Sequence, residues 1–278
     1  MHIYKLYSII ACFFFVTNLS AQEKIENVSP YETNVWRDGA FIATGVGLNI
    51  VGVLIIQNKE DLTEQELRNL SEEDIWKIDR WAAGNYSEKA NDDSYIPMFG
   101  AFAMPFALML NENERKHAGQ IAVLYVEAMA VTGALFSITA GLVEKSRPLV
   151  YNSSIPFEER LDSDEQRSFF AGHTASTAAA TFFVAKVYSD FNPDSELKPF
   201  IWAAAAAIPA TVGYLRIRAG KHFLTDNLIG YAVGAASGIL IPELHKKTNN
   251  RLDIYPAVGF HHPAFDIKST GIGITYQL

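Results

Sequence analysis

Six long apolar segments, separated by polar ones, occupy most of the chain after residue 38. Each is at least 16 residues long, which exceeds the usual length of a strand and favours a helix. The first segment carries no charged residue and is about as long as a helix that crosses a bilayer. The pattern predicts an all-α protein with six helices, over residues 39–56, 95–110, 121–143, 172–187, 200–215 and 228–244.

The apolar pattern leaves open whether these helices lie in a membrane. Several segments are rich in alanine and glycine and are interrupted by Glu127 or Lys186, which suits close helix packing in water as well as in lipid. A membrane-embedded bundle and a soluble bundle are therefore both retained as hypotheses.

Residues 1–21 have the layout of a secretory signal. Lys5 precedes an apolar run over 7–16, and the small residues Ser20 and Ala21 follow it. We expect export and cleavage near Ala21, which would place the mature N-terminus outside the cytoplasm. The cations Lys246 and Lys247 after the last segment indicate the opposite orientation, with a periplasm-facing site.

Two further segments differ from the apolar helices. The acidic loop 58–94 contains, at 62–70, the pattern of a short amphipathic helix. We interpret Asp79 and Arg80 in this loop as an ion pair that organises it. The tail, 252–278, is rich in glycine and β-formers and predicts a β-hairpin. The expected organisation is a signal peptide (1–21), a helical domain (22–251) and a β-like tail.

Composition removes several classes of function. The formal net charge of -8 argues against a nucleic-acid partner, because a phosphate backbone selects for basic surfaces. The only cysteine, Cys12, lies in the predicted signal, so the mature chain would contain no thiol. Disulfides, thiolate metal sites and cysteine nucleophiles are then excluded.

Candidate chemistry begins with Arg216, His222 and Asp226, just ahead of the last apolar segment. If the chain is helical here, His222 and Asp226 lie on one face, and the carboxylate can hold one ring nitrogen while the other stays free. Such a histidine is equipped to act as a nucleophile.

Two other clusters, one with an arginine and one with a histidine, lie at the ends of apolar segments. Arg147-Pro148 ends one segment, and Gly172-His173 begins the next. Two guanidinium groups beside a helix N-terminus suit a compact oxyanion such as phosphate. Two histidines can then complete a phosphoryl transfer, because one attacks phosphorus and the other protonates the leaving alkoxide.

These clusters resemble the motifs of the type 2 phosphatidic acid phosphatase and vanadium haloperoxidase superfamily, which read Lys-x6-Arg-Pro, Pro-Ser-Gly-His and Ser-Arg-x5-His-x3-Asp. The resemblance covers residues 140–230, and the spacing of the third motif is its most specific part. It implies a six-helix bundle of the acid phosphatase and vanadium haloperoxidase type, in which His222 forms a phosphohistidine, Asp226 orients it and His173 is the general acid. No metal and no cofactor are expected. The implied phosphate-binding residues are Arg147, Arg216 and the Gly172 amide.

The chain departs from the family pattern at four positions, in all three motifs. The family lysine position holds Ala140, Pro-Ser-Gly-His reads Phe170-Ala171-Gly172-His173, and Leu215 stands before Arg216 in place of serine. Lys145 and Lys221 are candidates to replace the lost phosphate contacts.

The sequence thus predicts an exported phosphatase that acts on a phosphomonoester or diphosphate, most simply that of a lipid in the membrane. A soluble periplasmic acid phosphatase and a catalytically weakened phosphate-binding relative are the alternatives, with vanadium-dependent halide oxidation a more distant one. His117, His261 and His262 are given no catalytic role.

Overall fold

The computed structural model describes residues 28–247, 252–262 and 267–276. The predicted signal, 1–21, lies outside the described residues together with Cys12. Its export and cleavage therefore stay predictions.

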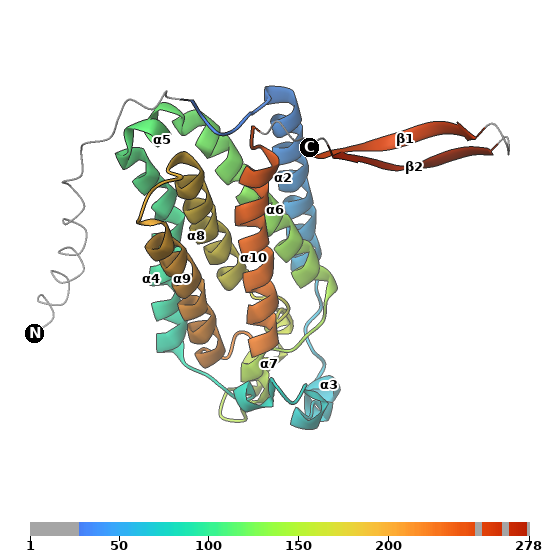
Figure 1. Ribbon diagram of the computed structural model, residues 1–278. Coiled ribbons are helices and arrows are strands. Elements are labelled where there is room, and N and C mark those ends of the chain that lie inside the picture. The colour runs from blue at the N-terminus through green and yellow to red at the C-terminus, as the bar shows by residue number, and fades with distance from the viewer. Residues whose placement is uncertain (1–27, 248–251, 263–266, 277–278) are drawn as a thin grey trace, which may run out of the picture.

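Long helices that run side by side in alternating directions dominate the fold (Figure 1). Each contains most of one of the predicted apolar segments. Their bounds are α2 (Val35–Gln57), α4 (Glu88–Ala107), α6 (Ala118–Leu142), α8 (Gly172–Phe191), α9 (Lys198–Arg218) and α10 (Leu224–Leu244).

The start of α4 differs from the prediction, because the helix begins seven residues before the apolar segment at 95–110. The Ser87 side chain caps the helix by accepting a hydrogen bond from the Ala90 amide. Its first turns are polar because Asn91 and Ser94 contact Arg216, as described below. Hydropathy alone cannot detect helical turns that face a polar site.

Short helices and turns gather mainly at the ends of the long helices. The predicted amphipathic helix is α3, whose first turn is closed by a capping box between Thr63 and Glu66. The other short helices lie between the long ones. Together they are α3 (Glu64–Asn69), α5 (Glu112–Lys116), α7 (Phe157–Leu161) and the 3₁₀ helices η2 (Glu72–Asp74), η3 (Arg80–Ala82), η4 (Leu108–Leu110), η5 (Pro148–Tyr151) and η6 (Ser163–Gln166).

The expected ion pair between Asp79 and Arg80 is wrong. Asp79 instead accepts hydrogen bonds from the amide and hydroxyl of Thr225 in the first turn of α10. The Arg80 guanidinium donates to the carbonyl oxygens of Glu73 and Ile75. The buried carboxylate of Asp79 satisfies a helix N-terminus rather than its neighbour in sequence.

Helix α8 is the central element, because it packs against α4, α6, α9 and α10. Among the described residues, no large apolar side chain of α8 is exposed, whereas each of the other long helices exposes at least two. Thr174, Thr177 and Thr181 are buried in α8, and this helix is not among those apolar enough to cross a membrane. A helix enclosed by protein needs no lipid-compatible surface.

Small residues bring α8 and α10 into backbone contact. A Cβ added at Gly230 would lie 2.5 Å from the Ala171 carbonyl oxygen, so no side chain fits there. Carbonyl oxygens one and two turns further on block a Cβ in the same way. The facing pairs are Gly230–Ala171, Gly234–Ala175 and Gly238–Ala179. This packing holds the N-terminus of α8 against the start of α10.

The helices other than α8 form an apolar exterior. Five helices, α2, α4 with η4, α6, α9 and α10, are long and apolar enough to cross a membrane. The outward-facing Phe41, Ile50 and Leu54 of α2 are 48%, 57% and 52% exposed. Large exposed apolar side chains in this number are rare on soluble proteins and suit a lipid environment. The fold therefore indicates a membrane protein and disfavours the soluble bundle.

The C-terminal segment contains two paired strands, β1 (Leu252–His262) and β2 (Ile267–Tyr276). They are antiparallel, with Leu252 opposite Tyr276 and a bulge between Val258 and Phe260. Figure 1 shows the pair extending away from the helices at the end of the bundle opposite α3 and α7.

Candidate active site

All three motifs lie at the end of the bundle that carries α3 and α7 (Figure 1). Arg147 precedes η5, His173 is the second residue of α8 and Arg216 lies in the last turn of α9. Lys221 and His222 belong to the connection between α9 and α10, and Asp226 lies in the first turn of α10. Alternating helix directions thus collect residues that are up to 79 positions apart, counting from 147 to 226.

The α9–α10 connection turns at Gly220, whose φ is +72°. A side chain there would be strained and would also clash with the carbonyl oxygen of Asn85. The Gly220 carbonyl accepts a hydrogen bond from the Leu149 amide at 3.0 Å. The turn therefore holds His222 beside the segment that follows Arg147.

His222 is buried, and its Nδ1 lies 2.6 Å from the carbonyl oxygen of Ser168. A carbonyl can only accept, so Nδ1 carries the proton and the neutral ring keeps its lone pair on Nε2. Burial lowers the pKa of His222 well below its usual value, and the charges of Arg216 and Arg147 lower it further. The structure therefore favours the neutral, nucleophilic form.

The prediction that the Asp226 carboxylate accepts a hydrogen bond from the His222 ring is wrong. Helix α10 begins at Leu224, so His222 precedes the helix and the two residues do not share a helix face. Asp226 caps α10 by accepting from the Phe223 amide at 3.0 Å, and it also accepts from the Ser168 hydroxyl at 2.6 Å. Ser168 thus links the two residues, since its carbonyl holds His222 and its hydroxyl binds Asp226.

Lys145 is bound by carboxylates. Its Nζ lies 2.6 Å from Asp226 Oδ1 and 3.8 Å from Asp79 Oδ2. It also lies 4.9 Å from the centre of the Phe223 ring. The lysine neutralises two buried acids beneath the site, so its predicted contact with phosphate would have to compete with Asp226.

Glu165 joins two of the predicted phosphate-binding cations. Its carboxylate lies 3.2 Å from Arg147 Nη1 and 2.9 Å from Lys221 Nζ. Burial alone would raise the pKa of Glu165, but the charges of Arg147 and Lys221 outweigh it and lower the pKa. Burial and the charge of Arg147 lower the pKa of Lys221. An anionic side chain therefore occupies cations that a substrate phosphate would need.

Arg216 is buried and is held from α4. Its Nη1 donates to Asn91 Oδ1 at 2.7 Å and to the Ser94 hydroxyl at 3.4 Å. Its Nε has no hydrogen-bond partner among the described residues, and the same is true of Arg147 Nε. Each guanidinium thus keeps a donor for a further acceptor.

His173 lies against Tyr95, with ring centres 5.1 Å apart in an edge-to-face contact. Its Nε2 is buried and, within the described part of the chain, has no hydrogen-bond partner. One oxyanion among these groups would offer acceptors to His173, Arg147 and Arg216 together. Buried polar groups without partners are rare, and their clustering here fits a phosphate site.

Gly172 is the first residue of α8, where backbone amides have no partner within the helix. A Cβ at this position would lie 2.6 Å from the Phe136 ring, which leaves room only for glycine. Ala171 precedes it as the N-cap and supplies no side-chain hydrogen bond. The helix N-terminus faces the site, without the serine that the family places there.

The buried Ala140 stands where the family has lysine. Lys59, two residues after α2, donates to the Ala140 and Val143 carbonyl oxygens at 3.1 and 2.7 Å. It thereby satisfies the C-terminus of α6 and stabilises the turn that leads to Arg147. Burial lowers the pKa of Lys59.

Several site residues could not be found from the sequence, namely Lys59, Asn91, Glu165 and Ser168. Each is an ordinary polar residue of a loop or helix end, in segments with many similar residues. Only their positions in space distinguish them.

The fold and the candidate site together indicate a class: a helical membrane protein with a cluster of buried and half-buried arginine, lysine and histidine side chains at one end. Comparison with known families agrees with this class, because residues 121–250 match the PAP2 superfamily. The match confirms the resemblance carried by the three motifs, and it covers 130 of the 278 residues.

Two solved structures are similar to this chain. LpxE from Aquifex aeolicus is 20% identical, with a TM-score of 0.41, and the alignment covers 59% of this chain and 92% of that one. A PAP2-type phosphatidylglycerolphosphate phosphatase from Bacillus subtilis is 18% identical, with a TM-score of 0.44. That alignment covers 71% of this chain and 93% of the other one. A comparison with curated proteins gave no significant match.

Proposed function

We propose that this protein is a phosphatase that hydrolyses a phosphomonoester or diphosphate of a membrane lipid through a phosphohistidine intermediate. The observation that carries the proposal is the state of His222. The Ser168 carbonyl fixes its Nδ1 proton, burial keeps the ring neutral, and Nε2 is the nucleophilic nitrogen.

The reaction is a double displacement. His222 Nε2 attacks phosphorus and forms an N–P bond, while the bond from phosphorus to the leaving oxygen breaks. Burial and the charges of Arg216 and Arg147 lower the pKa of His173 to about 3 in the free site, and a bound phosphate would offset those charges, so that His173 enters the reaction protonated. His173 then donates its proton to the leaving oxygen and takes a proton from the water that hydrolyses the phosphohistidine. Phosphate leaves and His222 is restored. Because side chains supply the nucleophile, the acid and the positive charge, the proposed reaction needs no metal ion.

The negative charge of the transition state is stabilised by the groups that keep free donors. Arg147 and Arg216 bind the phosphate oxygens through Nε, and the Gly172 amide adds a helix N-terminus. In this proposal Lys145 holds Asp226, which fixes Ser168 and, through it, His222. Lys221 binds phosphate after its ion pair with Glu165 is broken.

A lipid substrate is supported by the position of the site. Its residues lie at the ends of helices whose exposed faces are apolar, so a phosphate headgroup can reach them while its chains stay in the bilayer. We further propose that the site faces the periplasm, with Lys246 and Lys247 at the cytoplasmic end.

A second function, a weakened phosphate-binding relative, is favoured by two observations. Ala171 offers no hydroxyl to the transition state, and Glu165 competes for Arg147 and Lys221. Loss of one transition-state donor costs about 2.7–4 kcal/mol, which is on the order of 100-fold to 1,000-fold in rate. Such a relative would bind vanadate with no turnover.

The first prediction tests the proposed reaction in detergent micelles. Wild-type protein should release phosphate from lipid phosphates without added metal, and vanadate should inhibit it. His222→Ala should lower the rate at least about 1,000-fold, because a nucleophile is lost.

The matched control is His117→Ala, which removes an imidazole at the other end of the bundle and should keep full activity. Equal rates for His222→Ala and wild type would refute the phosphohistidine. Vanadate binding without phosphate release would instead establish the weakened relative.

A further inference from the structure

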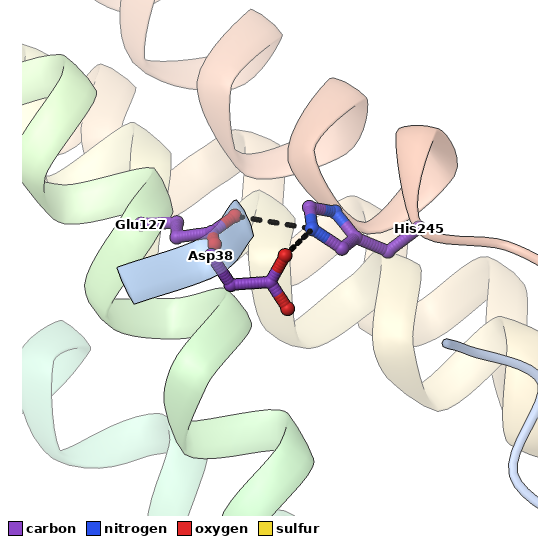
Figure 2. Close-up of side chains that lie close together, drawn as sticks. All are labelled: Asp38, Glu127 and His245. Carbon is purple, nitrogen blue, oxygen red and sulfur yellow. Dashed lines mark ion pairs between the residues drawn. The ribbon is translucent and has the colours of Figure 1, made fainter. Parts of the chain in front are cut away.

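A second cluster of ionisable side chains lies at the opposite end of the bundle. It contains Asp38 from the first turn of α2, Glu127 from α6 and His245, the residue that follows α10 (Figure 2). Since α10 has 21 residues, the cluster is about 30 Å from His222. Nothing in the proposed phosphatase reaction uses it.

The donor atoms of the cluster converge on one point. His245 Nε2 lies 3.5 Å from Asp38 Oδ1 and 3.4 Å from Glu127 Oε2, and one donor atom from each residue lies within 4.8 Å of the others. Two bonds of about 2.1 Å at a tetrahedral metal place their ligand atoms about 3.4 Å apart. The two measured separations from the imidazole match that spacing.

The tautomer of His245 is the one that binds metals. Its Nδ1 lies 2.8 Å from the Ile241 carbonyl oxygen and must donate to it, so the lone pair of the neutral ring is on Nε2. That lone pair faces the two carboxylate oxygens (Figure 2). A carbonyl that orients an imidazole in this way is the usual outer partner of a metal-bound histidine.

Glu127 provides the second, independent observation. The residue is only 1% exposed, and both of its carboxylate oxygens are buried without a hydrogen-bond partner among the described residues. The carboxylate points at His245 (Figure 2). A buried carboxylate is costly unless it is paired or binds a metal, and 3.4 Å is longer than a normal hydrogen bond to the imidazole.

The other charge near the cluster leaves it anionic. Arg37 donates to Asp38 Oδ1 at 2.8 Å, and the Asn34 amide donates to Oδ2 at 2.6 Å. When the His245 ring is neutral, which metal binding requires, Arg37 balances one of the two carboxylates and the charge of Glu127 is left for a cation.

We propose that Asp38, Glu127 and His245 form a binding site for one divalent transition-metal ion, with zinc as the fitting example. Two carboxylates and an imidazole suit such an ion better than magnesium or calcium, which prefer oxygen ligands. Both oxygens of Glu127 can bind, so three side chains supply four donor atoms. The ion would tie α2, α6 and α10 together at this end of the bundle.

The test measures zinc retained by the full chain, purified in detergent through a tag without histidines. The protein is stripped with EDTA, loaded with Zn²⁺ in the presence of excess Mg²⁺ and separated from free metal by gel filtration. We expect about one zinc per chain by mass spectrometry of the metal. Zinc should also raise the melting temperature of the wild type.

Glu127→Gln keeps the shape of the side chain and should weaken zinc binding at least about tenfold, and His245→Ala should do the same. Glu114→Gln and His117→Ala, a buried glutamate and a histidine outside the cluster, should retain zinc as the wild type does. Zinc at the wild-type level in Glu127→Gln, or none in the wild type, would overturn the site. The test does not measure phosphate release. Its result therefore decides the zinc site independently of the proposed phosphatase reaction.

Discussion

Glu165 has two opposing effects on the candidate site. It bridges Arg147 and Lys221 and thereby stabilises two buried cations in the absence of substrate. The same carboxylate repels an incoming phosphate. In the proposed reaction, a substrate phosphate would therefore compete with Glu165 for Arg147 and Lys221.

Glu165→Gln should strengthen inhibition by vanadate about tenfold, which corresponds to about 1.4 kcal/mol. The amide keeps the shape of the side chain but no longer competes as an anion for Arg147 and Lys221. The measurement is the inhibition constant of vanadate in phosphate release. Glu144→Gln, which changes an exposed glutamate at the same end, serves as the control. Weaker inhibition in Glu165→Gln would show that Glu165 positions Arg147 for the anion.

At the scale of elements, the site depends on how closely α8 and α10 approach. His173 is carried by the first turn of α8, while His222 precedes α10. The glycines of α10 allow the two backbones to touch, so the separation of the two histidines is set by packing several turns away.

Gly234→Ala should destabilise the protein by about 1–3 kcal/mol, because the new methyl group would clash with the Ala175 carbonyl oxygen and push α10 from α8. Phosphate release should fall with it. The measurement is thermal unfolding in detergent. Gly47→Ala on α2 is the control, since no heavy atom lies within 4 Å of its added Cβ. That change should be neutral or stabilising by up to about 1 kcal/mol. Equal melting temperatures for both variants would contradict close packing of α8 and α10.

For the whole molecule, the alternation of helices ties membrane orientation to the predicted leader. The start of α2 and the phosphate site lie at opposite ends of the bundle (Figure 1). If every long helix crosses the membrane, a cleaved export signal puts the site in the cytoplasm. A periplasm-facing site requires Val35 to be cytoplasmic. If every long helix crosses the membrane, cleavage of the leader and a periplasm-facing site are therefore incompatible predictions.

Labelling of single cysteines in intact cells decides the orientation. In a Cys12→Ser background, Ser153→Cys at the site end should react with a membrane-impermeant maleimide, whereas Asp194→Cys at the other end should react only after lysis. Both positions are exposed. The reverse pattern would place the site in the cytoplasm and support cleavage of the leader.

The sequence by itself determined the long helices, the three motifs and the resemblance to the PAP2 superfamily, because apolar length and fixed spacing are local properties. It could not determine which polar groups meet. The i,i+4 rule paired His222 with Asp226, but α10 begins between them and Ser168 takes the place of the carboxylate.

Only the tertiary structure decided the charge arrangement of the two ends of the bundle. Glu165 and Lys59 resemble many other charged residues in their loops, and they gain their roles from helix ends that are distant in sequence. Asp38, Glu127 and His245 are separated by 89 and 118 residues, counting from 38 to 127 and from 127 to 245. No local pattern records such a cluster, because helix packing alone brings its members within reach of a single ion.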